Sequence, residues 1–186
     1  MILPIYLYGS QVLREKAKEV EIDTPSQKEK LKSLIANMWE TMEQAYGVGL
    51  AAPQIGQSIR VLVVDGAPLA EDMAELEGFK RVIINPVKLY ESEEEIEYNE
   101  GCLSIPDVNA IISRPKKMRI KYLNENFEEV VEELDNFACR MVQHEMDHLD
   151  GILFTDLAPP IRKKMLSNKL SNIRAGKSNP DYKIKR

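Results

Sequence analysis

One stretch of the chain reads Asn136-Phe-Ala-Cys-Arg-Met-Val-Gln-His-Glu-Met-Asp-His-Leu149. Apolar residues recur in it at helical spacing and share one broad face: Phe137, Ala138, Met141, Val142 and Leu149. Gly151 comes just beyond the stretch, as is common after a helix C-terminus. The pattern predicts a helix over 136–149 that is buried by the elements around it.

Two further helices are expected, one on each side of this stretch in the sequence. The first begins after Thr24, because Thr24 and Gln27 have the spacing of a capping box, and it ends at Gly47. The second is shorter, follows Pro159-Pro160 and runs through Asn172.

Val and Ile gather in two short segments, 60–65 and 81–85, which are predicted to be buried strands. The segments 118–123 and 127–134 flank the sequence Asn-Glu-Asn and predict a hairpin. Strands and helices do not alternate regularly along the chain. We therefore expect an α+β fold rather than a doubly wound sheet, in one domain that spans residues 1–186.

The composition narrows the class of protein. The chain has 186 residues, with 25 Lys and Arg against 30 Asp and Glu and a formal net charge of −5. This balance argues against a protein that coats nucleic acid, and we expect no sequence-specific nucleic-acid partner. Two cysteines cannot make a disulfide framework, and no targeting segment or membrane-spanning run is visible. We expect a cytoplasmic protein without a membrane partner.

The segment 161–186 differs from the rest of the chain, because it is rich in Lys and Arg and has Asp181 as its only acidic residue. One interpretation is a solvated helix followed by a frayed tail. The other is an electrostatic contact surface for a polyanion such as RNA. Charge alone leaves both interpretations open.

The strongest chemical signal is His144-Glu-Met-Asp-His148, an HExxH pattern on the predicted helix. Successive helical residues rotate by about 100°, so His144 and His148 lie one turn apart on one face and can reach one metal ion. Glu145 lies at the edge of that face, where it can contact a metal-bound water. Because these are the only histidines of the chain, a metal site is a better interpretation than packed or solvated side chains.

A catalytic metal site of this kind needs a third protein ligand. Phe154 occupies the downstream position that carries this ligand in some zinc peptidases. Cys139 is on the same helix but is rotated by about 140° from His144, so we expect a core residue. Cys102 is on a separate segment and is the favoured third ligand. A thiolate with two imidazoles suits Fe(II), Zn(II), Co(II) or Ni(II).

The segment Gly47-Val-Gly-Leu-Ala-Ala-Pro-Gln54 imitates a dinucleotide-binding fingerprint, but it follows a predicted helix instead of a strand and Pro53 interrupts it. Its glycines are interpreted as backbone that a ligand can approach closely, or as a helix end and turn. Gln54 is either a surface amide or a donor to a developing oxyanion.

Three motifs, Gly47-Val-Gly-Leu-Ala-Ala-Pro-Gln54, Glu100-Gly-Cys-Leu-Ser104 and the HExxH pattern, have the order and approximate spacing found in bacterial peptide deformylases. The chain resembles that family over its full length. The resemblance implies an α+β fold in which mixed or antiparallel sheets wrap around a central buried helix that carries HExxH, with a further helix at the C-terminus. It also implies an enzyme that removes the N-formyl group from nascent polypeptides that begin with formylmethionine, releasing formate.

For the reaction centre, the resemblance implies that Cys102, His144 and His148 are the metal ligands and that Glu145 is the catalytic carboxylate. A bound divalent metal lowers the pKa of its water to about 7. The resulting hydroxide is expected to attack the formyl carbon, while Glu145 accepts its proton and passes it to the departing amine. The metal is expected to be Fe(II) in the cell, and Zn(II), Ni(II) or Co(II) can occupy the site in isolated protein.

For the substrate, the resemblance implies that Gln54 and the backbone N–H of Leu103 stabilise the oxyanion. It also implies that the peptide binds as an added strand along three positions: Val48, Gly49 and Gly101. Met141 comes one turn before Glu145, and its helix position predicts that it lines an apolar pocket for the methionine side chain. The basic segment 161–186 resembles the element associated with the ribosome exit in bacterial members, which makes the ribosome an expected partner.

Three other classes of protein are alternatives. A zinc endopeptidase shares HExxH but is expected to have a downstream third ligand, which this chain lacks. A Cys–His hydrolase would use Cys102 as the nucleophile and would stay active after chelation. A structural metal module would hold the ion with four protein ligands, of which the sequence offers three.

Overall fold

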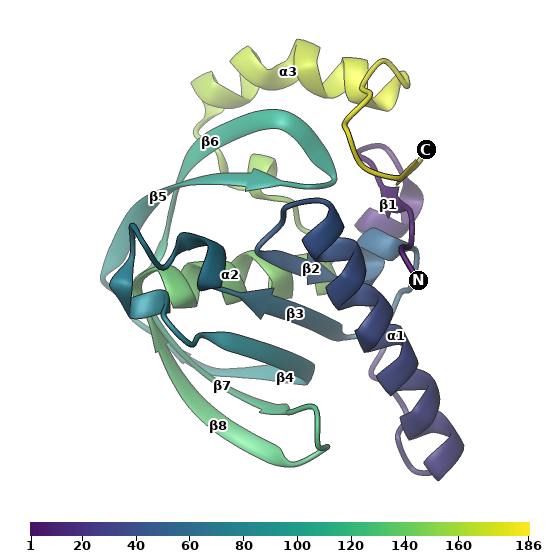
Figure 1. Cartoon of the computed structure of the whole chain (residues 1–186). Coiled ribbons are helices and arrows are strands. Elements are labelled where there is room, and N and C mark those ends of the chain that lie inside the picture. Colours follow the sequence, from purple (N-terminus) through teal and green to yellow (C-terminus); the bar gives the residue numbers. More distant parts are fainter.

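The computed structural model describes residues 1–186 and contains one large antiparallel sheet (Figure 1). Its strands have the spatial order β2-β3-β4-β7-β8. They are β2 (Gly49–Ala51), β3 (Val61–Asp65), β4 (Lys80–Glu91), β7 (Lys117–Leu123) and β8 (Glu129–Asp135). Residues 61–64 of β3 are completely buried, because the sheet is covered on both faces.

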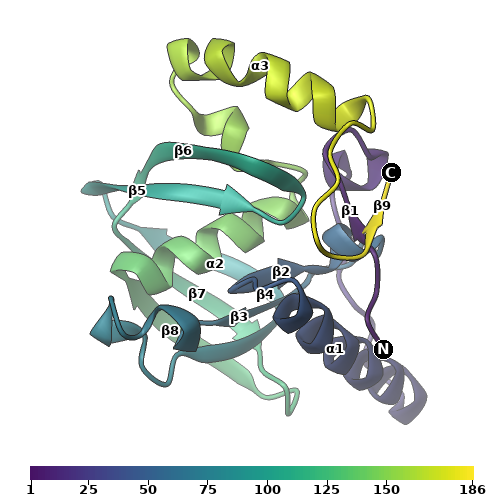
Figure 2. The ribbon, with the colours of Figure 1, turned by 45° about the horizontal axis from the view of Figure 1, so that its top comes forward.

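Helix α2 (Asn136–Leu149) lies between this sheet and a second, two-stranded sheet (Figures 1 and 2). The second sheet is the hairpin of β5 (Glu95–Cys102) and β6 (Ile105–Pro115). Apolar side chains of α2, including Val142 and Leu149, pack with the large sheet in one core cluster. The helix that carries both histidines is therefore enclosed by sheets, and the predicted α+β fold is confirmed.

Helix α1 (Pro25–Gln44) covers the opposite face of the large sheet. Its first turn has the predicted capping box, in which Thr24 Oγ1 accepts from the Gln27 N–H at 3.2 Å and Gln27 Oε1 accepts from the Thr24 N–H at 3.0 Å. Alternate residues of β3 point to opposite faces of the sheet. Val61 and Val63 therefore pack with α1, whereas their neighbours pack with α2.

Helix α3 (Pro160–Arg174) lies along the outer side of the β5–β6 hairpin (Figure 1). Its residues Leu166 and Ile173 are buried in a third apolar cluster that includes β6. After α3 the chain turns back, and β9 (Ile184–Lys185) pairs in parallel with β1 (Ile5–Tyr6), so the N-terminal and C-terminal segments lie side by side (Figure 2). None of the helices is both long and apolar enough to cross a membrane.

The predicted helices and strands are present, with some shifted boundaries. The helix over 136–149 has the predicted bounds. The strand expected over 81–85 continues to Glu91, and its outer half pairs with β7 through two register shifts. The last helix extends to Arg174 instead of ending at Asn172, since nothing in its last turn interrupts helical geometry.

Two features differ from the sequence-based expectation. The β5–β6 hairpin has no counterpart among the predicted strands, because β5 carries exposed acidic residues at alternate positions and few large apolar ones. The tail after α3 is not frayed, so that part of the first interpretation is wrong. The Ile5 N–H donates to the Lys183 carbonyl at 2.9 Å and the Leu7 N–H to the Lys185 carbonyl at 3.1 Å.

Candidate metal centre and active site

Strand β5 and helix α2 bring the three expected metal ligands together. Cys102 ends β5, while His144 and His148 lie one turn apart on α2. One ligand atom from each residue lies within 4.8 Å of the other two. The Cys102 Sγ and the His148 Nε2 are 3.4 Å apart. Cys139 is fully buried in the core between α2 and the large sheet, as its position on the helix predicts.

The donor set fits a divalent transition metal. A thiolate and two imidazoles suit iron, zinc, cobalt and nickel better than magnesium or calcium, which prefer oxygen ligands. Burial lowers the pKa of His148 well below its ordinary value, so the ring is neutral and keeps a lone pair for a metal. Three protein ligands beside a cavity are typical of a catalytic centre, whereas a structural zinc site is closed by four.

His144 is oriented by Glu100, a residue of β5 to which the sequence patterns assign no role. The His144 Nδ1 lies 2.8 Å from the Glu100 Oε1, so the ring N–H donates to the carboxylate and Nε2 is left for a metal. Such a partner fixes the tautomer and strengthens the ring as a ligand. The sequence could have pointed to Glu100. It is two residues before Cys102, and alternate residues of a strand share a face, so both side chains point toward the same site.

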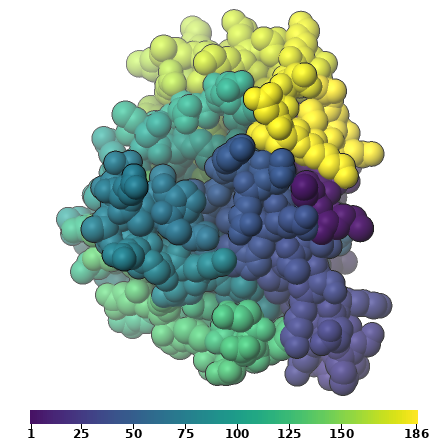
Figure 3. All heavy atoms as spheres, viewed as in Figure 1, coloured from purple at the N-terminus to yellow at the C-terminus, as the bar shows by residue number.

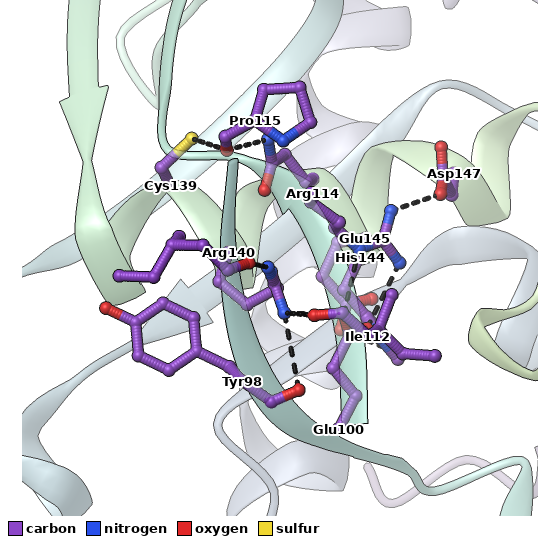
Figure 4. A network of polar contacts seen from close by, with 12 residues as sticks. Tyr98, Glu100, Ile112, Arg114, Pro115, Cys139, Arg140, His144, Glu145 and Asp147 are labelled. Atoms are coloured by element: carbon purple, nitrogen blue, oxygen red, sulfur yellow. Dashed lines mark hydrogen bonds and ion pairs between the residues drawn. The ribbon is translucent and has the colours of Figure 1, made fainter. Parts of the chain in front are cut away.

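Glu100 is itself enclosed by two arginines (Figure 4). The Arg114 Nε donates to the Glu100 Oε2 at 2.8 Å, and the Arg140 Nη1 donates to the same oxygen at 3.1 Å. These three side chains are 2–6% exposed. Arg114 also donates to the Asp147 Oδ2 at 2.6 Å, which ties β6 to α2. The carboxylate that orients His144 therefore belongs to a buried network of charged side chains, which joins β5, β6 and α2.

The same network keeps Glu100 ionised and fixes the hairpin to the helix. Burial would raise the pKa of Glu100, but hydrogen bonds from His144 and Arg114 outweigh it and hold the pKa at about 2. Arg140 donates to the carbonyl oxygens of Ile112 at 2.8 Å and Ile96 at 2.7 Å. Both strands of the hairpin are thus bonded to one side chain of α2.

Glu145 follows His144 on α2 and lies beside the ligand cluster. Its Oε1 is 4.0 Å from the His144 Nε2, and its buried Oε2 has no hydrogen-bond partner. Burial raises the pKa of Glu145 to about 7. A buried carboxylate oxygen without a hydrogen-bond partner lowers the stability of the fold. This geometry therefore suits a site that receives a hydrogen-bond donor or a proton from a bound molecule.

Gln54 and Leu103 lie next to Cys102. The Gln54 Nε2 donates to the Cys102 Sγ at 3.4 Å and to the Ser104 Oγ at 3.2 Å, while its Oε1 accepts from the Ala51 N–H at 2.9 Å. These contacts fix the side chain with its N–H groups toward the sulfur. Leu103 lies between β5 and β6, and its N–H donates to no other group of the protein.

A cavity of about 580 Å³ opens onto the ligand cluster and Glu145. Its walls include the three positions expected to hold a substrate strand: Val48, Gly49 and Gly101. Met141 lines a smaller adjoining cavity of about 130 Å³, to which the same three residues contribute. The two cavities share wall residues, and most of the residues expected in the site line one or both of them. His148 lines neither cavity but lies against Cys102, which lines the larger one.

The chain is similar to known proteins along its whole length. The family model described as polypeptide deformylase matches residues 2–164. The peptide deformylase of Christiangramia forsetii is 45% identical over 100% of this chain and 96% of its own length. That of Salinibacter ruber is 44% identical over 99% of this chain and 94% of its own.

Solved structures agree with these relatives. The peptide deformylase of Thermus thermophilus has a TM-score of 0.82 and 39% identity, covering 95% of this chain and 99% of that one. The peptide deformylase of Thermotoga maritima has a TM-score of 0.76 and 39% identity, covering 86% and 99%. By sequence and by fold, this chain belongs to the polypeptide deformylase family, the enzymes that remove the formyl group from an N-terminal methionine.

Proposed function

We propose that the chain hydrolyses the N-formyl group of nascent polypeptides that begin with formylmethionine, at a divalent metal held by Cys102, His144 and His148. The observation that carries the proposal is the convergence of these ligand atoms within 4.8 Å beside a cavity, although they come from two elements far apart in the sequence. When bound, the metal acidifies a water molecule and so supplies the nucleophile for the formyl carbon.

Glu145 moves the proton in this scheme. Its carboxylate accepts a proton from the attacking water and passes it to the nitrogen of the departing amine. The buried Oε2 supports this role, because it has no partner within the protein and is free to take the proton. Glu145 is thus the general base of the first step and the general acid of the second.

Backbone and amide donors stabilise the charge and hold the substrate. The Gln54 Nε2 and the Leu103 N–H donate to the formyl oxygen as negative charge develops on it. The peptide lies as an added strand along three positions: Val48, Gly49 and Gly101. Its methionine side chain enters the smaller cavity, where Met141 supplies an apolar wall.

Gly49 provides a test of this arrangement. A Cβ at position 49 would lie 2.6 Å from the Glu145 Oε1, so Gly49→Ala must displace the carboxylate. A misplacement of about 1 Å can cost 10²-fold in rate, and we expect kcat for formate release to fall about 100-fold with the metal content unchanged. Gly78→Ala is the control, because it strains a backbone of φ +72° with no atom within 4 Å; an equal loss in both variants would contradict the steric argument.

Removal of the metal should lower the stability of the fold. A ligand present at 100 times its Kd stabilises the native state by about 2.7 kcal/mol, and for a chain of this size that corresponds to about 5–10 °C in Tm. We expect chelation to lower Tm by this amount and to abolish formate release, and readdition of Fe(II), Ni(II), Co(II) or Zn(II) to restore Tm. An unchanged Tm after complete metal removal would argue against the ligand set. We propose Fe(II) as the metal in the cell.

Helix α3 is proposed to contact the ribosome. Lys163, Lys164 and Lys169 are exposed and pair with no acidic side chain, so their charge is available to RNA phosphates. Exchange of these lysines for glutamate should weaken cosedimentation with bacterial ribosomes by about tenfold or more, because fewer phosphate charges are neutralised. Raising the salt concentration from about 50 to about 200 mM should also weaken ribosome binding by the wild-type chain. Salt-independent binding would contradict an electrostatic contact.

The central experiment measures formate released from a formyl-Met peptide by anaerobically purified, metal-loaded protein, with a chelated sample beside it. Formate from the loaded sample alone supports the proposed function. Activity that survives chelation favours Cys102 as a nucleophile, and cleavage of internal peptide bonds favours an endopeptidase. Metal binding without either activity favours a structural module.

A further inference from the structure

The C-terminal tail, residues 175–186, returns to the active site, although the family model ends at residue 164. It pairs with β1 through β9, and in Figure 3 its atoms (yellow) lie against those of the N-terminal segment (purple). Residues 179–182 line the large cavity beside the metal ligands. The tail is therefore a wall of the active site.

Tyr182 connects this tail to the turn between β5 and β6. Its hydroxyl donates to the Leu103 carbonyl oxygen at 2.5 Å, across 79 residues of sequence. Burial raises the pKa of the Tyr182 hydroxyl, so it stays protonated and remains a donor at neutral pH. The bond reaches the residue whose N–H is proposed to stabilise the oxyanion.

Few other bonds hold this turn. The Tyr8 N–H donates to the Ser104 carbonyl at 2.8 Å, and the Gln54 Nε2 donates to the Ser104 hydroxyl at 3.2 Å. Tyr8 comes two residues after β1, the strand with which the tail pairs. The Leu103 carbonyl accepts from Tyr182 and from no other group. Both ends of the chain thus hold the turn, and Tyr182 is the only side chain bonded to Leu103.

We propose that Tyr182 is a positioning residue for deformylation, which holds the turn so that the Leu103 N–H stays directed at the formyl oxygen. This inference rests on the proposed oxyanion role of Leu103. Donors stabilise a developing charge most effectively when they are fixed beforehand and need no reorganisation during the reaction. The carbonyl and the N–H of Leu103 flank one Cα, so anchoring the first restrains rotation of the second.

The first test is Tyr182→Phe in the metal-loaded full chain. The phenylalanine ring still lines the cavity, and only the hydroxyl group is removed. Loss of a whole oxyanion donor costs about 10²–10³-fold in kcat, and a donor that is loosened should cost less, about tenfold. We expect kcat to fall by that factor while KM changes less than twofold and the metal content stays constant. Tyr90→Phe is the matched control, since Tyr90 is half exposed on β4 and lines neither active-site cavity.

The second test does not use activity. The Tyr8 amide bonds to the Ser104 carbonyl, so its hydrogen-exchange rate reports on opening of the turn. We expect exchange at Tyr8 to be about tenfold faster in Tyr182→Phe and unchanged in Tyr90→Phe. A kcat within twofold of the wild type, or unchanged exchange, would overturn the positioning role. Formate release by the wild type separately tests the proposed function. If the wild type is active and Tyr182→Phe is equally active, the positioning role of Tyr182 is wrong and the proposed function stands.

Discussion

Glu145→Gln is expected to lower kcat for formate release about 10³-fold while the metal stays bound and the fold stays intact. Glutamine has the shape of glutamate but cannot accept the proton of the attacking water, and general acid–base catalysis contributes about 10²–10⁴-fold. Glu145 is outside the cluster of ligand atoms formed by Cys102, His144 and His148, so the metal content should not change. KM should change little, because the side chain length is conserved.

Steady-state formate release and metal analysis of the same samples check this expectation. Glu133→Gln is a matched control, because Glu133 is half exposed on β8 and pairs only with Arg119. The control should keep its activity within twofold. A Glu145→Gln variant that retains more than a tenth of the wild-type kcat would remove Glu145 from the proton transfer. Loss of the metal would instead assign it a structural role.

Glu100→Gln is expected to destabilise the protein by about 3–5 kcal/mol, because it leaves one of two buried arginines with Asp147 as its only acidic partner and the other without a counter-charge. It should also weaken metal binding about 10–100-fold, since Glu100 fixes the ring of His144. The arginines are Arg114 and Arg140, with side chains 6% and 2% exposed. Among the substitutions considered, this one should have the largest effect on the free energy of unfolding.

Denaturant unfolding of the metal-free protein and competition with a chelator separate the two effects. The double variant Glu100→Gln with Arg140→Met also removes the arginine charge that is left without a partner, so it should recover part of the lost stability. It should not recover metal affinity, because His144 still lacks its carboxylate partner. A single variant within about 1 kcal/mol of the wild type would show that the network contributes little to the fold.

Local spacing was sufficient to predict much of the molecule. Thr24 and Gln27 form the predicted capping box, because both residues act within one helical turn. The helix over 136–149 has its predicted bounds, and the burial of Cys139 follows from its rotation relative to His144. The β5–β6 hairpin was not predicted, because strand β5 has too few large apolar residues to show an alternating strand pattern.

Helical spacing alone predicts the relative directions of the two histidines and Glu145, because the α-helix sets them whatever surrounds it. The sequence also pointed to Cys102, by elimination and by resemblance. The contact by which Glu100, 44 residues before His144, orients the His144 ring appears in the folded chain and not in the sequence pattern, and so does the bond from Tyr182 to Leu103. The two kinds of contact differ in range: backbone geometry fixes neighbours within a turn, whereas contacts between distant segments depend on how sheets and helices pack.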